Sequence, residues 1–174
     1  MSASLRTIPG KTGQAPCLDF DFNGVTGAAS ISEDGAVEVS HGSFSIEPFL
    51  IDGGKLVTWA DVKTSQSLRD RYLPIPSVRW EAGKLALTTT AFAQGDPGRS
   101  QLVVSYRVAN DGDAARDVTL ALAARPFQVN PPTQFLNAPG GTSHVDDLAW
   151  DGHASLPSGE TKLAPGQTGL RAHL

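Results

Sequence analysis

The residues of this chain best suited to acid–base chemistry are its four histidines. His41, His144, His153 and His173 all lie in glycine-rich or polar loop sequence. Nucleophilic catalysis needs a base within hydrogen-bond reach of a serine or cysteine. None of these histidines belongs to a Gly-x-Ser-x-Gly or comparable frame. We therefore interpret them as exposed loop residues and predict no catalytic residue in this chain.

Metal binding would have to use one short segment. Its acids and histidines are His144, Asp146, Asp147, Asp151 and His153. The spacing of the two histidines matches no structural zinc pattern. Asp-Gly turns are a commoner cause of such acids than calcium binding. A phosphate-binding Gly-x-x-x-x-Gly-Lys-Ser/Thr loop is also missing from the sequence. We predict no metal site and no cofactor.

Glycoside hydrolysis needs a pair of carboxylates on either side of the scissile bond. Four acids lie in or beside predicted strands: Glu47, Asp61, Asp70 and Glu81. The sequence alone does not pair any two of them. Solvent-facing strand positions are the ordinary place for such residues.

Sugar binding needs exposed flat aromatic rings beside planar polar groups, because the apolar faces of sugars stack on rings. The candidates are four aromatic residues and three arginines: Trp59, Tyr72, Trp80, Trp150, Arg69, Arg71 and Arg79. Trp59 and Trp80 lie inside strand patterns, so core packing is the favoured interpretation for both. The carbohydrate-binding set predicted from sequence is Trp150, Tyr72, Trp59 and Arg71.

The elements that must position these side chains are strands. Residues 77–129 predict four or five strands in succession, with a turn signal at almost every join. The segment 117–127 is rich in alanine and leucine, which favour a helix. Its apolar residues nevertheless alternate with a period of two, and Pro126 suits a helix interior poorly. A strand is therefore predicted there.

The first half of the chain shows the same alternation. Residues 18–22 alternate, and Asn23-Gly24 predicts a hairpin turn after them. Residues 52–54 predict another turn, followed by a strand over 56–62 that carries Trp59. Residues 65–72 fit either a strand or a short helical turn. The chain is thus predicted to be an all-β protein, an antiparallel β-sandwich.

Length and composition agree with one sandwich domain. The chain has 174 residues, of which 40% are hydrophobic and 18% charged, so a packed core is expected rather than disorder. Its 18 glycines and 12 prolines suit many tight turns. We predict a flexible tail over 1–15, the sandwich over 16–152 and an irregular segment over 153–174. One more short strand is expected at 145–150.

Net charge, hydropathy and cysteine content limit the classes of partner and the structural features expected of this chain. The formal net charge of −4 argues against nucleic acid as a partner. No apolar stretch approaches the roughly 20 residues that a membrane span needs. Cys17 is the only cysteine, so the chain has no internal disulfide. The expected compartment is the cytoplasm, or the periplasm or exterior if a signal peptide has been removed.

Four stretches carry a resemblance to a known kind of protein. They read LVTWADV at 56–62, QSL to LPIPSVRW at 66–80, YRVAN at 106–110 and AARPFQVNPP at 123–132. As a set they resemble a β-sandwich region of large bacterial glycoside-hydrolase-like proteins. Those proteins have an (α/α)-toroid catalytic domain, and some also carry discoidin (coagulation factor 5/8 type C) modules. The sandwich is similar to the galactose-mutarotase-like supersandwich that precedes such toroids.

The resemblance implies that the catalytic acids belong to a toroid, which these strands do not contain. It therefore implies no catalytic residue here. A full supersandwich is longer than this chain, and the apolar pattern after Trp150 is weak, so we expect a fragment of a larger domain. The implied function is a non-catalytic accessory domain of a carbohydrate-active multidomain protein. Its expected partners are the other domains of the parent chain, which would dock on an apolar patch, and carbohydrate.

Two alternatives stay open. The first is an independent carbohydrate-binding module that uses exposed aromatic residues on one sheet face. The second is an aldose-epimerase-like enzyme, which would require a histidine and a carboxylate in one cleft.

Overall fold

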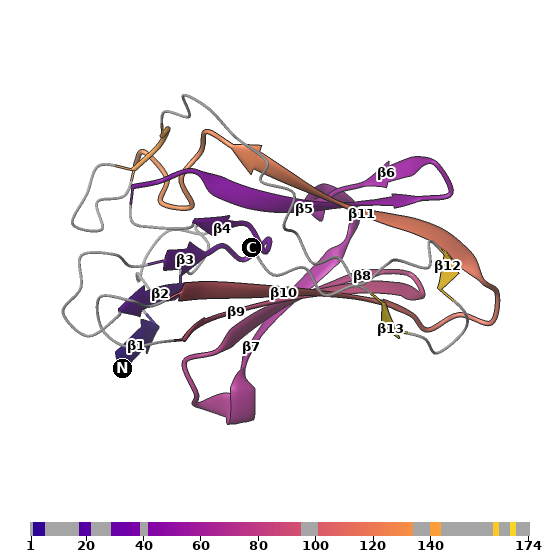
Figure 1. The fold of residues 1–174 in the computed structure, drawn as a ribbon, viewed down its shortest axis with the longest axis horizontal. Coiled ribbons are helices and arrows are strands. Elements are labelled where there is room, and N and C mark those ends of the chain that lie inside the picture. The colour runs from indigo at the N-terminus through magenta and orange to yellow at the C-terminus, as the bar shows by residue number, and fades with distance from the viewer. Residues whose placement is uncertain are drawn as a thin grey trace.

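Two antiparallel β-sheets face each other in the computed structural model of the chain (Figure 1). The structure describes residues 2–5, 18–21, 29–38, 42–94, 101–133, 140–143, 162–163 and 168–169. The predicted fold class, an all-β antiparallel sandwich, is confirmed. The two helical elements in the described ranges are single 3₁₀ turns, and neither is long enough to cross a membrane.

The first sheet contains the first six strands of the described chain together with two later strands. In spatial order it consists of β1 (Ser2–Leu5), β2 (Leu18–Asp21), β3 (Ala29–Ile31), β4 (Val37–Glu38), β5 (Ser45–Asp52), β11 (Arg116–Arg125) and β12 (Lys162–Leu163). The short strand β6 (Lys55–Val57) also pairs with β5. The pairing of β1 with β2 gives part of the predicted N-terminal tail a place in the sheet.

The second sheet is a meander with a short strand added at one edge. Its order is β13 (Thr168–Gly169), β10 (Gln101–Asn110), β9 (Leu85–Gln94), β8 (Pro76–Ala82) and β7 (Lys63–Leu68). Strands β8 to β11 are the four strands predicted between residues 77 and 129. The last of them, β11, crosses to the first sheet and pairs with β5 along eight residue pairs. This crossing ties the two layers together.

Glycine residues form the tight turns of two hairpins. Gly53 and Gly54 join β5 to β6 with φ of 56° and 83°, the left-handed pair that a type I′ turn requires. Gly83 joins β8 to β9 with φ of 62° in the first central position, as in a type II′ turn. Both turns lie where the sequence predicts them.

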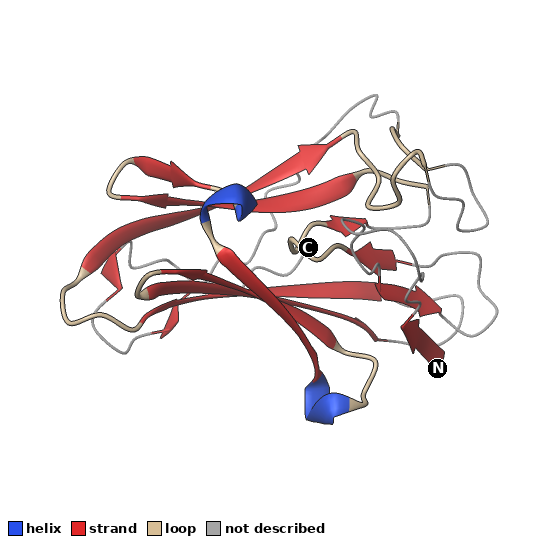
Figure 2. Cartoon of the chain, turned by 180° about the vertical axis from the view of Figure 1, so that it is seen from behind, coloured by secondary structure: helices blue, strands red, loops and turns tan. Residues whose placement is uncertain are grey.

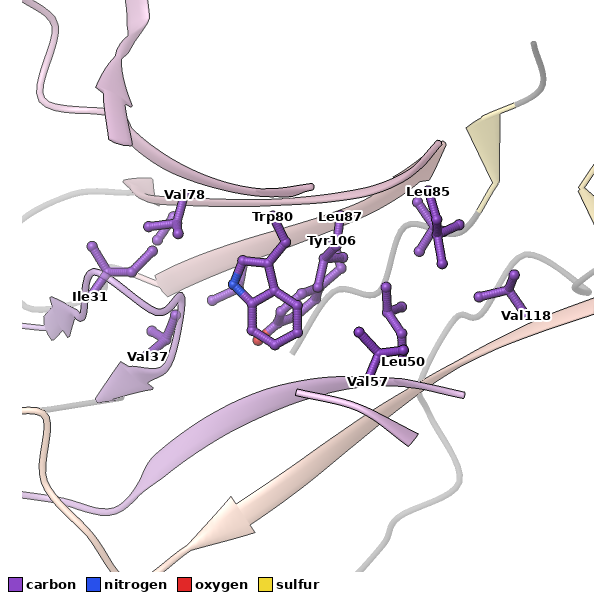
Figure 3. Close-up of a cluster of buried hydrophobic side chains, with 13 residues drawn as sticks. Ile31, Val37, Leu50, Val57, Val78, Trp80, Leu85, Leu87, Tyr106 and Val118 are labelled. Atoms are coloured by element: carbon purple, nitrogen blue, oxygen red, sulfur yellow. The ribbon is translucent and has the colours of Figure 1, made fainter. Parts of the chain in front are cut away.

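The core lies between the two sheets. Figure 3 shows Leu50 and Val57 of the first sheet directed toward Trp80 and Tyr106 of the second. Trp80 is only 1% exposed, and its Nε1 donates a hydrogen bond to the backbone oxygen of Asp34 at 2.8 Å. Core packing of Trp80 is therefore confirmed.

The predicted strand over 56–62 is wrong beyond Val57. The Thr58 hydroxyl accepts a hydrogen bond from the backbone N–H of Ala60, and the Asp61 carboxylate accepts one from the backbone N–H of Thr58. This capping box stops the strand and starts the 3₁₀ turn η1 (Trp59–Asp61). Trp59 is consequently 47% exposed, so its predicted core packing is also wrong.

Both alternatives for residues 65–72 occur in succession. The strand β7 ends at Leu68, and the 3₁₀ turn η2 (Arg69–Arg71) follows it. The predicted turn at Asn23-Gly24 and the predicted strand at 145–150 lie outside the described residues.

Candidate functional site

The edge strand β7 links two exposed 3₁₀ turns in the described part of the chain. It pairs with β8 on one side, and no other strand of the described ranges pairs with its outer edge. Its first five residues are exposed on both faces. Figure 2 shows a short helix at each end of this strand, η1 near the first sheet and η2 projecting below the second.

The loop after β7 holds an unusual backbone. Asp70 and Arg71 have φ of 53° and 68°, and they are the only non-glycine residues with positive φ in the described ranges. A left-handed residue with a side chain costs roughly 1–2 kcal/mol, and aspartate tolerates it better than arginine. We call residues 69–75 the Tyr72 loop.

Backbone hydrogen bonds fix the Tyr72 loop in this shape. The N–H of Arg69 donates to the oxygen of Ile75 at 3.1 Å, which closes the base of the loop. The oxygen of Arg69 accepts from Leu73 at 2.9 Å and from Tyr72 at 3.3 Å. Pro74 and Pro76 further restrict the returning chain. The loop is therefore held in one conformation by its own residues.

Four side chains of the Tyr72 loop, at positions 69–72, are exposed to solvent. Tyr72 is 75% exposed, and Arg69, Asp70 and Arg71 are exposed beside it. None of the four forms a side-chain hydrogen bond or ion pair within the described residues. The loop thus presents an aromatic ring and two guanidinium groups that have no side-chain partner in the described part of the chain.

Other arginines of the sandwich have partners. Arg79 contacts Glu81 at 3.2 Å and Asp111 at 3.5 Å. Arg125 contacts Glu47 at 2.6 Å, and its guanidinium lies 5.0 Å from the ring centroid of Phe127. Arg79 and Arg125 thus form ion pairs, which Arg69 and Arg71 do not form with any described residue.

The structure brings together only part of the predicted carbohydrate-binding set. Arg71 and Tyr72 are adjacent in the Tyr72 loop. Trp59 lies at the opposite end of β7, and a strand of this length spans about 20 Å. These aromatic rings therefore belong to two places on the surface. Trp150 lies outside the described residues.

The four acids considered for hydrolysis are placed singly. Glu47 is on β5, Asp61 is in η1, Asp70 is in the Tyr72 loop and Glu81 is on β8. The N–H and hydroxyl of Thr58 donate to Asp61 and lower the pKa of its carboxyl group. Glu47 and Glu81 face the arginines named above. Each acid is thus accounted for by a local partner or by solvent.

A buried carboxylate holds the segment after β11 in place. It was not among the residues predicted from the sequence. Glu38 is 1% exposed. Its Oε1 accepts from the N–H of Gly42 at 2.6 Å, and its Oε2 accepts from Val129 at 2.8 Å and Asn130 at 3.3 Å. These bonds join β4 to residues more than 90 positions later. The role of Glu38 is structural.

The outer face of the first sheet carries a row of apolar residues. Ile51 lies opposite Leu56 on one side and Thr119 on the other, and Phe49 lies opposite Ala121. Their neighbours Leu50 and Val57 point into the core, so this row faces outward. Leu56 is 54% exposed. We call Phe49, Ile51, Leu56 and Ala121 the outer row.

No histidine lies in the described ranges. They contain no group of three or more histidine, cysteine, aspartate or glutamate residues that could hold a metal ion. The four histidines lie outside the described residues, and so does the segment 144–153, which was considered above as a metal site.

Comparisons with protein-family models, with curated proteins and with solved structures find no match to this chain.

Proposed function

We propose that this chain is a non-catalytic β-sandwich accessory domain of a multidomain carbohydrate-active, glycoside-hydrolase-like protein. In this role it packs against a neighbouring domain of the parent chain through the outer row of the first sheet. The outer row is the observation that carries the proposal.

The outer row supports a docked neighbour for a physical reason. Antiparallel sheets with one face in solvent alternate apolar residues inside with polar residues outside. Phe49, Ile51 and Leu56 break that alternation on adjacent strands. Clustered apolar side chains of this kind mark sites where another surface packs.

The use of the acids supports a non-catalytic role. Glu38, the most buried acid of the described ranges, accepts three backbone hydrogen bonds that anchor a loop. Glu47 accepts from Arg125, and Asp61 caps η1. A general acid or base needs a proton-transfer position facing substrate. These carboxylates face their own fold instead.

The test compares this chain with the full product of its reading frame. In a Cys17→Ser background, Leu56→Cys places a thiol in the outer row, and Ser65→Cys places a matched thiol on the exposed strand β7. Maleimide labelling rates are measured for both variants in both proteins. We expect Leu56→Cys to react at least about tenfold more slowly in the full product, while Ser65→Cys keeps its rate.

Equal labelling of Leu56→Cys in the two proteins would reject docking through the outer row. A reading frame with no further domain would reject the multidomain assignment. Hydrolysis of a glycoside by the isolated chain would reject the non-catalytic role.

A second candidate function is an independent carbohydrate-binding module. The exposed ring of Tyr72 beside Arg71 favours it, since sugar sites combine a stacking ring with planar hydrogen-bond donors. Calorimetric titration against a panel of glycans tests it, and no heat with any glycan would reject it. The aldose-epimerase-like alternative has no such support, because His41 and His144 lie outside the described residues.

A further inference from the structure

We propose that the Tyr72 loop is a binding site for a carboxylate-bearing polysaccharide, with Arg69 and Arg71 as the anion contacts and Tyr72 as the stacking ring. The choice of a saccharide rests on the proposed function. The location of the site rests on the loop alone.

The two arginines supply the anion contacts. A guanidinium group presents a planar fork of N–H donors that matches the two oxygens of a carboxylate. Arg69 and Arg71 lie on either side of Asp70 in η2, and neither forms an ion pair with an acid of the described residues. As far as the described residues go, both arginines keep their donors available for a ligand.

Tyr72 supplies the second half of the recognition. Its ring stands 75% exposed directly after the two arginines. An exposed ring can cover the apolar face of a pyranose, while its hydroxyl bonds to a sugar oxygen. A uronic acid offers both an apolar ring face and a carboxylate, so it matches this set of side chains.

The strained backbone of the Tyr72 loop supports a ligand-binding role. Arg71 has a φ of 68°, and glycine at this position would adopt the same angle without the steric cost. Non-glycine residues held in this region cluster at ligand-binding positions. The hydrogen bonds between Arg69, Leu73 and Ile75 keep the shape before any ligand arrives. A preformed site loses less entropy on binding.

The net charge of the whole chain opposes the binding of an anionic polymer. With a net charge of −4, the molecule as a whole repels an anionic polymer. Binding must therefore come from a local positive site. It should weaken moderately with salt, as expected for about two ionic contacts rather than a broad basic surface.

The experiment is calorimetric titration with polygalacturonate oligosaccharides, with neutral galactan oligosaccharides and polyglutamate as comparison probes. We expect Arg71→Ala and Tyr72→Ala each to weaken polygalacturonate binding about tenfold or more. Arg79→Ala is the matched control. It removes the same charge from an exposed arginine that is paired with Glu81 and Asp111, and we expect little change in affinity.

A second variant separates binding from folding. Arg71→Gly relieves the left-handed backbone and removes the guanidinium group. We expect it to raise the thermal unfolding midpoint while it weakens polygalacturonate binding. A loop whose arginine serves only the fold would show a lowered midpoint, which would contradict the proposal.

Three results would overturn it: no binding of polygalacturonate, equal weakening by Arg71→Ala and Arg79→Ala, or binding of galactan with the same affinity. Equal or tighter binding of polyglutamate would reassign the loop to acidic peptides. The labelling of Leu56→Cys is independent of all these measurements. It therefore shows whether a failure belongs to the loop or to the accessory-domain proposal.

Discussion

A single buried carboxylate, Glu38, connects strand β4 with the segment that follows β11. We expect Glu38→Ala to lower the free energy of unfolding by about 2–3 kcal/mol, because backbone N–H groups of Gly42, Val129 and Asn130 lose a charged acceptor. Glu38→Gln keeps one carbonyl acceptor and should cost less. Urea unfolding measures both variants, and hydrogen exchange of the Val129 amide reports the local release.

The control for Glu38 is Glu81→Ala, which removes an exposed acid on β8. We expect it to change stability by no more than about 0.5 kcal/mol. If Glu38→Ala unfolds at the same urea concentration as Glu81→Ala, the anchoring role assigned to Glu38 is wrong.

Asp34 should make stability depend on pH. Burial first, and then the nearby charge of Glu47, raise the pKa of the Asp34 carboxyl above 3.8, its value without these effects. The folded state therefore holds its proton more tightly than the unfolded state. This contribution is fully present below about pH 3.8 and is lost as pH rises through the higher folded pKa.

Replacing Asp34 by asparagine removes that ionisation. We expect Asp34→Asn to unfold at a higher temperature than the parent near pH 7, with a gap that shrinks as pH falls through the raised folded pKa of Asp34 toward about 3.8. The backbone oxygen that accepts from Trp80 is kept in the variant. Thermal unfolding between pH 3 and pH 7 measures the gap, and a constant gap over this range would contradict the assignment.

At the scale of elements, the hairpins were predictable because their chemistry is local. A turn between adjacent strands depends on two or three residues, and glycine is the residue that allows a positive φ. We expect Gly83→Ala to destabilise the chain by about 1–2 kcal/mol, since φ there is 62°. Lys84→Ala in the same turn should have little effect. Urea unfolding that gives equal values for the two would show that the turn relaxes freely.

The elements that the sequence predicted wrongly were also decided locally, by a competing signal. The apolar pattern of residues 56–62 continued through Trp59 and predicted one long strand. Thr58 and Asp61 form a capping box that ends the strand after Val57. The strand period outweighed this shorter motif in the prediction. A Thr-x-x-Asp spacing at that point was the available signal.

The candidate site was only partly predictable for a related reason. Tyr72 and Arg71 are neighbours in sequence, so their proximity needed no knowledge of the fold. The separation of Trp59 from them depends on β7 being extended between two turns. Glu38 gave no sequence signal, since its partners Val129 and Asn130 lie 91 and 92 positions away. Long-range contacts of this kind follow from the pairing of whole strands.

At the scale of the whole molecule, both sheets share one core. Buried residues from β3, β5 and β6 pack in the same cluster as residues from β8, β9 and β10. The strand β11 leaves the meander of the second sheet and pairs in the first. Neither layer can therefore open without exposing apolar surface of the other, and we expect the described sandwich to unfold as one cooperative unit.

Tryptophan emission can test this cooperativity, because Trp80 lies between the sheets and Trp59 lies outside them. With Trp59→Phe and Trp150→Phe combined, the remaining Trp80 should be shielded from acrylamide in the native state. Its emission should shift to longer wavelength at the urea concentration where the far-ultraviolet circular dichroism is lost. With Trp80→Phe and Trp150→Phe combined, Trp59 should be quenched already in the native state. If Trp80 became accessible before the circular dichroism changed, the sheets would separate before the strands unfold, and the single shared core would not be the unit that holds this molecule together.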